Sequence, residues 1–552
     1  MMNNKKNIII QLLIVLVGAM IYIPFLGQVH LFDWDEINFA EAAREMIVTG
    51  DYLTVQIDYQ PFWEKPPLFI WMQAFSMNIF GINEFAARFP NAVCGIVTLL
   101  VLYNIGRRLV DIRFGILWSF VYLASFLPFF YFKSGIIDPW FNLFIFLGLY
   151  FFVLFTDFRG RLPLTRYLIY SAFFLGLAIL TKGPVAFLIW GITVFTYWIV
   201  VRFRMRITFT QVISFLFVLF GIGGLWFIIQ VFTGNYQIVK DFIVYQVRLF
   251  QTQDAGHGGF PFYHVVILLL GVFPSSTFAI PGFFKQGVDT PSQRHFRRWM
   301  TILFFTVLIL FSIVKTKIIH YSSMTYFPVT FFATYFIYKW QARETTRKWG
   351  TDVLLVFITI IYIALISLFP LIDKYKTIII ESGRIKDPFA LGNLTANVQW
   401  SGYELLLGSL LIIGLIFYFV FTYRGKTLKG INSILISSTV FIFLTMIIII
   451  PKIEGYSQHA AILFYKEHKD RNVYINPLGF KSYAHLFYSR KQPVTNNLSY
   501  NQNWLLTGEI DKPAYFVIKN YKAEKFFEKY SELQFLQEKN GFVFAVRYPR
   551  EK

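Results

Sequence analysis

The sequence predicts a mostly α-helical, polytopic transmembrane protein with a small α/β domain at its C-terminal end. Of its 552 residues, 56% are hydrophobic and 15% are charged, against about 45–50% apolar and about 25% charged in an average soluble domain. The formal net charge is +20. This composition excludes a water-soluble enzyme and a nucleic-acid binder, so we interpret the basic excess in relation to a membrane surface.

Apolar windows long enough to cross a bilayer recur through most of the chain. A bilayer core requires about 20 apolar residues per helix, and windows of that size predict about 13 spans. A shorter apolar run near residues 66–80 also fits a helix at the membrane interface. The predicted spans lie near residues 7–29, 85–105, 114–132, 139–156, 167–181, 184–201, 208–232, 263–283, 299–314, 323–338, 351–371, 402–422 and 431–450.

Basic residues are concentrated in every second connection between these windows. Short loops rich in lysine and arginine mark the cytoplasmic side of a membrane protein. We therefore predict a cytoplasmic N-terminus and, for an odd number of spans, a C-terminal domain on the extracytoplasmic side. The basic segments contain Lys5 and Lys6; Arg107, Arg108 and Arg113; Arg159, Arg161 and Arg166; Arg202, Arg204 and Arg206; Lys285, Arg294, Arg297 and Arg298; Lys339, Arg343, Arg347 and Lys348; and Arg424, Lys426 and Lys429.

The composition changes after Pro451, where long apolar runs end and charged residues become frequent. We predict a transmembrane domain over residues 1–455 and an extracytoplasmic α/β domain over residues 456–552. Short alternating runs predict strands and the longer segments predict helices. The predicted strands are residues 472–476, 513–519 and 541–547, and the predicted helices are residues 457–469, 481–488 and 522–529.

The first outer loop, roughly residues 30–66, is unusually acidic: it contains eight of the 31 acidic residues. Within it, residues 36–48 carry apolar side chains at helical spacing, with Asn38, Glu41 and Glu45 opposite them. This pattern predicts an amphipathic helix on the membrane surface. A solvated loop that merely covers the bundle is the alternative.

Further ionisable residues are predicted on the same side of the membrane, where such groups are candidates for function. Interfacial lysines suit a phosphate, carboxylates suit a general base, and a glutamate with a histidine suits a divalent metal. Together with an apolar groove, this chemistry indicates transfer of a sugar from a polyprenyl phosphate, and no glycine-rich nucleotide motif is present in the sequence. The candidates are Asp35, Glu64, Lys65, Lys133, Asp138, Lys182, His257, Lys315, Lys317, His320 and Tyr321.

Several short motifs resemble the membrane glycosyltransferases of the GT-C fold, in particular aminoarabinose transferases and bacterial protein O-mannosyltransferase-like proteins. The resemblance covers about residues 8–340, and it is the order and spacing of the motifs together that are specific. The motifs are Asp35-Glu36, Phe39-Ala40-Glu41, Ala43-Arg44-Glu45-Met46, Glu64-Lys65-Pro66-Pro67 and Thr181-Lys182-Gly183-Pro184.

The resemblance implies a role for each matching residue. Asp35 takes the place of the first-loop catalytic acid and Asp138 that of the second key aspartate. Lys65 takes the place of the phosphate-contacting lysine, with Lys182, Lys317 and Tyr321 as further donor-phosphate residues. Glu64 and His257 match positions that hold a zinc ion in an aminoarabinose transferase. No nucleotide cofactor is expected.

The sequence therefore predicts a glycosyltransferase of a bacterial-type inner membrane, with its active site on the extracytoplasmic side. It would move a sugar from a polyprenyl-phosphate carrier to a lipid A-like glycolipid, a protein or a glycan, with inversion at the anomeric carbon. The sequence leaves the choice of acceptor open. Two other classes also fit a polytopic chain: a transporter or flippase of lipid-linked sugars, and a scaffold whose outer domain recruits partners.

Overall fold

The computed structural model describes residues 2–32, 34–156, 165–205, 207–251 and 258–550. In these residues, each of the predicted membrane windows coincides with one helix or with two successive helices. These are α1 (Met2–Tyr22), α4 (Glu84–Leu109), α5 (Ile112–Leu123) with α6 (Phe126–Tyr131), α7 (Asp138–Thr156), α8 (Thr165–Lys182), α9 (Val185–Val200), α10 (Phe209–Gly223) with α11 (Leu225–Phe232), α13 (Tyr263–Gly271) with α14 (Ser275–Gly282), α15 (Pro291–Ile313), α16 (Tyr326–Gln341), α17 (Trp349–Lys374), α20 (Leu406–Tyr423) and α21 (Thr427–Ile448).

The polytopic helical fold class is thereby confirmed, whereas the number of spans is not. Among the described residues, seven helices are long and apolar enough to cross a membrane, or up to nine if each bent pair counts as one span. The bent pairs are α10–α11, at 59°, and α13–α14, at 113°. Helices α5 and α9 are apolar but shorter, so about 13 spans stays a prediction.

The remaining helices of the membrane part lie at the ends of the bundle or connect its long helices. They are α2 (Trp34–Thr49), α3 (Leu68–Phe80), α12 (Tyr236–Gln251), η1 (Ile319–Thr325), α18 (Lys376–Glu381), α19 (Pro388–Leu394), η2 (Tyr403–Leu405) and α22 (Ile450–Gly455). The short strands β1 (Gln56–Ile57) and β2 (Gln60–Pro61) form a hairpin in the first loop.

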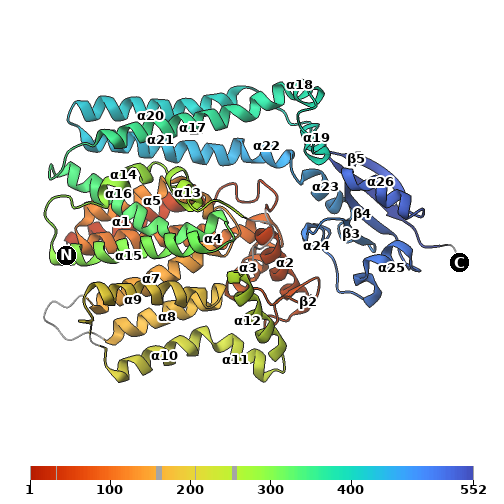
Figure 1. Cartoon of the computed structure of the whole chain (residues 1–552), viewed down its shortest axis with the longest axis horizontal. Helices are drawn as coiled ribbons and strands as arrows, with labels where there is room; N and C mark the ends of the chain where they lie inside the picture. Colours follow the sequence, from red (N-terminus) through yellow and green to blue (C-terminus); the bar gives the residue numbers. More distant parts are fainter. Residues whose placement is uncertain (1, 33, 157–164, 206, 252–257, 551–552) are drawn as a thin grey trace.

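The bundle has two different ends. In Figure 1, the N-terminus and the connections α16–α17 and α20–α21 lie at one end, whereas α2, α3 and the C-terminal domain lie at the other. The two connections are basic segments in the sequence, and the first loop is the acidic one. The predicted separation of basic and acidic loops is thus present in the fold.

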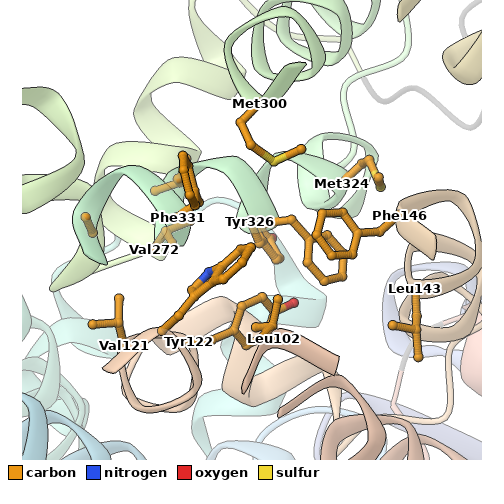
Figure 2. Close-up of a cluster of buried hydrophobic side chains, with 14 of the residues drawn as sticks. Leu102, Val121, Tyr122, Leu143, Phe146, Val272, Met300, Met324, Tyr326 and Phe331 are labelled. Atoms are coloured by element: carbon orange, nitrogen blue, oxygen red, sulfur yellow. The ribbon is translucent and has the colours of Figure 1, made fainter. Parts of the chain in front are cut away.

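Aromatic and aliphatic side chains from distant parts of the chain form the core of the bundle. Figure 2 shows residues of α4, α5, α7, α15 and α16 pointing toward one another around Tyr326. Phe146 of α7 stacks on Phe327 of α16 with ring centroids 4.2 Å apart. Close aromatic packing of this kind fixes helices laterally where the hydrophobic effect between helices is weak.

The C-terminal region folds around one mixed sheet in the order β3-β4-β6-β5. Strands β3 and β4 are parallel, and the other two pairings are antiparallel. Three strands and three helices coincide with those predicted. The strands are β3 (Tyr474–Leu478), β4 (Ala514–Lys519), β5 (Gln534–Lys539) and β6 (Phe542–Arg547), and the helices are α23 (His459–Glu467), α24 (Ala484–Ser489), η3 (Asn497–Tyr500), α25 (Gln502–Thr507) and α26 (Asn520–Lys529).

Strand β5 and the short helix α25 were missed by the sequence analysis. All six residues of β5 are exposed, so this edge strand lacks the alternation of apolar and polar residues that identifies a half-buried strand. Its pairing with β6, which is buried throughout, decides its conformation instead.

Helix α2 corrects one expectation about the first loop. The helix forms where it was predicted, but Asn38, Glu41 and Glu45 are buried and do not face solvent. The C-terminal helix α24 and helix α3 pack against α2. The helix is therefore an internal element between the bundle and the C-terminal region, and its polar residues need partners within the protein.

Candidate active site

Asp138 and Lys182 form an ion pair at the end of the bundle that faces the C-terminal domain. Asp138 is the first residue of α7, and Lys182 is the last residue of α8. The Lys182 Nζ donates to Asp138 Oδ1 at 2.7 Å, and the two side chains are 16% and 4% exposed. Gly183 follows with a φ of +95°, a backbone conformation that favours glycine and ends the helix.

His320 brings a second carboxylate into the same group. Its Nε2 lies 3.9 Å from Asp138 Oδ2 and 3.9 Å from Asp35 Oδ2. The histidine comes from η1, which begins at Ile319, and its side chain is 10% exposed. The structure thus brings the two predicted catalytic aspartates close to the same nitrogen of one imidazole.

His320 is a candidate residue of the sequence for which neither the residues nor the family resemblance predict a role. The signal was present: a histidine follows an apolar window on the side of the membrane where the acidic loop is predicted. The sequence does not show that these residues are close in space. Asp35, Asp138 and His320 are far apart along the chain and meet only because α2, α7 and η1 pack together.

Asp35 and its neighbour Glu36 have different surroundings. The Asp35 side chain is 32% exposed. Glu36 is buried and accepts hydrogen bonds from Arg88, from the backbone N–H of Gly135 at 2.6 Å and from that of Phe32 at 2.6 Å. Glu36 therefore anchors the loop to α4, whereas Asp35 remains open to a ligand.

Lys65 and Glu64 meet helix α12 through one tyrosine. The Lys65 Nζ lies 5.2 Å from the centroid of the Tyr245 ring, and the Tyr245 hydroxyl donates to Glu64 Oε2 at 3.2 Å. The positive charge of Lys65 also acts on the Asp138 carboxylate. Lys65 therefore belongs to the same electrostatic site as Asp138. His257, the second predicted metal ligand, lies outside the described residues.

The other two predicted phosphate residues differ in their surroundings. The ring of Tyr321 lies beside Lys182, with 5.7 Å between its centroid and the Lys182 Nζ. Lys317, in contrast, donates to the backbone carbonyls of Phe311, Ser312 and Val314 at 2.7–2.9 Å. Its ammonium closes the C-terminal end of α15, a common use of lysine.

An apolar cavity of about 240 Å³ adjoins His320. It also reaches the buried Glu36–Arg88 pair and Lys133. Burial and the nearby Arg88 lower the pKa of Lys133 to about 8, and its ammonium donates to the Pro24 carbonyl at 2.6 Å. The cavity combines apolar walls with a few polar groups, and His320 connects it to the two aspartates, as expected of a small-molecule site.

A larger cavity, of about 510 Å³, lies between α14 and the start of α17. Lys285 and Lys348 are among its lining residues, and the predicted site residues are not. Size alone therefore does not identify the site; the convergence of ionisable groups around His320 does.

A second group of charges on α2 is fully enclosed. Arg44 donates to both carboxylate oxygens of Glu41 at 2.6 and 2.7 Å. Glu45 accepts from the backbone N–H groups of Asp58 and Tyr59 at 2.6 and 2.8 Å. Burial, together with the neighbouring Glu41, raises the pKa of Glu45. We refer to Glu41, Arg44 and Glu45 as the closed cluster.

Comparison with protein families supports the resemblance drawn from the motifs. Residues 64–226 match the family model described as dolichyl-phosphate-mannose-protein mannosyltransferase. This segment begins at Glu64-Lys65 and includes Asp138 and Lys182.

Curated relatives are named after a related activity. An undecaprenyl phosphate-alpha-4-amino-4-deoxy-L-arabinose arabinosyl transferase of Photorhabdus laumondii is 26% identical over 328 residues, which are 58% of this chain and 57% of that protein. One of Shewanella sediminis is 26% identical over 371 residues, which are 66% of this chain and 67% of that protein. The chain matches little more than half the length of the first of these relatives.

Solved structures match over nearly the whole chain. The crystal structure of ArnT from Cupriavidus metallidurans bound to undecaprenyl phosphate covers 97% of both chains with a TM-score of 0.75 and 18% identity. The apo structure of the same protein gives the same TM-score. The chain therefore has the fold of this transferase, and its predicted resemblance to aminoarabinose transferases of the GT-C fold is confirmed.

Proposed function

We propose that this chain is a membrane glycosyltransferase that moves a sugar from a polyprenyl-phosphate carrier to an acceptor of the cell envelope. The observation that carries the proposal is the meeting of Asp35, Asp138 and Lys182 around His320 beside an apolar cavity. The names of the relatives and the shared fold support transfer over translocation.

In this reaction, the bond between the anomeric carbon and the carrier phosphate breaks, and a bond from that carbon to an acceptor oxygen forms. The carrier leaves as polyprenyl phosphate with the bonding electron pair. Lys65 is our candidate to hold this phosphate. The other lysine of the site, Lys182, is already paired with Asp138. A well-placed positive group that stabilises developing charge typically contributes about 3–4 kcal/mol.

The role of Asp35 depends on the acceptor. A hydroxyl must lose a proton as it attacks, and Asp35 is placed to accept it because its carboxylate is partly exposed at the site. An acceptor phosphate is already ionised, in which case Asp35 would only orient it. Attack from the face opposite the phosphate inverts the anomeric carbon. Lipid, protein and glycan acceptors are therefore tested side by side.

Glu64 and His257 remain our proposed zinc ligands. A carboxylate oxygen and an imidazole nitrogen are suitable donors, although two ligands do not complete a zinc site. Within the described part of the chain, Tyr245 donates to one carboxylate oxygen of Glu64, and the other oxygen could bind a metal. When bound, zinc would supply positive charge near the Lys65 side of the site.

We also propose that the site and the C-terminal domain face the extracytoplasmic side of an inner membrane. Cys94 is the only cysteine and is buried, so single new cysteines report accessibility in a C94A background. We expect a membrane-impermeant maleimide to label Glu538→Cys, on the exposed strand β5, in intact cells. Lys426→Cys, in the α20–α21 connection, should react only after lysis; the reverse pattern would invert the proposed topology.

The function is tested by sugar transfer with purified protein. Labelled sugar on a synthetic undecaprenyl phosphate is supplied with a lipid A-type glycolipid, a peptide or a glycan acceptor. We expect Asp35→Asn and Lys65→Ala each to lower the rate by about 10²–10³-fold. Asp241→Asn and Lys240→Ala on α12 are the matched controls and should keep the wild-type rate.

Two results would overturn the proposal. Full activity in both Asp35→Asn and Lys65→Ala would remove the site assignment. Movement of the intact sugar-lipid across proteoliposomes, with no new glycosidic or glycosyl-phosphate bond, would identify a flippase.

A further inference from the structure

A group of potential metal ligands lies where the first loop, the last membrane helix and the C-terminal domain meet. It consists of His30, Glu454 and His459, whose donor atoms all lie within 4.8 Å of one another. His30 follows α1, Glu454 lies in α22, and His459 begins α23. The group shares no residue with the proposed reaction centre or with the pair Glu64 and His257.

Each carboxylate oxygen of Glu454 contacts one of the two histidines. The His30 Nδ1 lies 2.9 Å from Glu454 Oε1, and the His459 Nδ1 lies 2.7 Å from Glu454 Oε2. The Glu454 side chain is only 5% exposed. In the described part of the chain, these two imidazoles are the basic groups that pair with Glu454.

Two imidazoles and one carboxylate are a donor set typical of zinc with one open coordination position. A tetrahedral zinc with nitrogen and oxygen ligands needs about 3.4 Å between neighbouring donor atoms. The nitrogen–oxygen distances of 2.9 and 2.7 Å would have to open by about 0.5 and about 0.7 Å. The His459 side chain is 37% exposed, so it has space to move by this amount.

The three segments are also held in position independently. Arg88 donates to the His30 carbonyl at 2.9 Å. The Gln458 side chain donates to the Leu31 carbonyl at 2.6 Å, and the Tyr488 hydroxyl accepts from the Leu31 N–H at 2.7 Å. Preorganised ligands lower the conformational entropy lost on metal binding.

We propose that His30, Glu454 and His459 form a binding site for a divalent transition metal, with Zn²⁺ as the probe ion, and that the metal fastens the C-terminal domain to the first loop. Both histidines would bind the metal through Nδ1, so a neutral imidazole moves its proton from Nδ1, where it now faces Glu454, to Nε2, and a protonated imidazole releases its Nδ1 proton to solvent. His30 precedes Asp35 by five residues. The metal would therefore steady the segment that carries Asp35. This inference stands without the proposed transfer reaction.

The experiment uses the full-length protein in detergent, stripped with a chelator and titrated with Zn²⁺. Bound metal per chain is measured by plasma mass spectrometry, and the thermal midpoint is followed at each concentration. We expect His459→Ala and His30→Ala each to lose one equivalent of zinc relative to the wild type. The zinc-dependent rise of the midpoint, a few degrees at a hundredfold excess over Kd, should disappear with it.

Two variants serve as controls. Glu64→Gln removes a ligand of the other proposed metal pair, and Glu467→Ala removes an exposed carboxylate on α23; both should retain the equivalent assigned to this site. His459→Gln keeps a polar group beside Glu454 and replaces His459→Ala if that variant does not fold. Co²⁺ absorption in the visible range then reports coordination directly.

Equal zinc content and equal midpoint shifts in the wild type and both histidine variants would overturn the proposal. The three side chains would then be a hydrogen-bonded bridge between imidazoles and a carboxylate. Loss of the equivalent in Glu64→Gln alone would likewise overturn it, because the metal would belong to the other pair.

Discussion

Asp35 and the closed cluster lie within the same helix, yet their carboxylates have opposite surroundings. Glu41 and Glu45 are covered, receive donors from Arg44 and from the backbone, and are fully buried. Asp35 is partly exposed and faces His320 at 3.9 Å. An acidic helix thus contains two kinds of carboxylate: those that hold the loop in place and one that is available to a ligand.

The difference arises from which elements cover α2. The turn of the β1–β2 hairpin covers the closed cluster, because Asp58 and Tyr59 donate to Glu45, and the C-terminal helix α24 also packs against α2. Glu36, next to Asp35, turns toward Arg88 and α4. Satisfied charges in this loop therefore indicate a structural role, and an incompletely paired charge beside a cavity indicates a functional one.

The largest effect should follow from breaking the closed cluster. Arg44→Met leaves the buried Glu41 carboxylate without its counter-charge, which typically costs about 3–5 kcal/mol. The thermal midpoint in detergent should fall, and the first loop should be cut faster by protease. Asp35→Asn is the matched variant on the same helix and should change stability by less than about 0.5 kcal/mol. Equal losses of stability in the two variants would show that the two kinds of carboxylate on α2 do not differ in structural role.

Lys317 allows the same comparison for a lysine, between a structural role and a role in phosphate binding. Lys317→Met removes three hydrogen bonds to carbonyls at the end of α15, so we expect a stability loss of about 1–3 kcal/mol. Lys315→Met, at an exposed position, is the control. A weaker donor affinity with unchanged stability would instead favour the phosphate role predicted from the sequence.

His320 should affect rate more than stability. It lies between the two aspartates, so His320→Gln should lower transfer about tenfold, equivalent to about 1.4 kcal/mol, by letting their relative positions vary. Single-turnover measurement at saturating donor separates this step from binding. A purely structural histidine would lower the thermal midpoint and leave the rate of the folded fraction unchanged.

The smallest effect concerns pH. Because the pKa of Glu45 is raised in the folded state, that state holds a proton that the unfolded chain releases. Its stabilisation is present at acid pH and is lost as pH rises from about 5 toward the raised pKa. In Glu45→Gln, the slope of the thermal midpoint against pH should become flatter. Any loss of a hydrogen-bond acceptor lowers the midpoint itself, but by the same amount at every pH. In the control Glu538→Gln, on the exposed strand β5, the slope should equal that of the wild type.

Periodicity and motif spacing were sufficient to predict the helical windows, the acidic first-loop helix and most of the C-terminal strands. They also predict Asp35, Lys65, Asp138 and Lys182 on one side of the membrane, and the structure brings Asp35, Asp138 and Lys182 together around His320. These features depend on local patterns, such as apolar length, turn residues and alternating loop charge, which a single sequence displays.

Features that depend on tertiary packing were not predictable in this way. Helix α2 packs against α24, which comes more than 400 residues later in the sequence. His320 reaches the site only because η1 packs beside α7. The carbonyls that bind Lys317 are set by the end of α15. Neighbours that are distant in sequence decide each of these cases.

The contacts of the first loop with the C-terminal region have a consequence for biosynthesis. Lys491 pairs with Asp58, and Tyr59 donates to the Lys491 carbonyl at 2.6 Å, so these bonds join parts of the chain that leave the ribosome far apart in time. Such non-local contacts form late. The loop that carries Asp35 would therefore reach its final conformation only after the segment around Lys491 has been translated and folded.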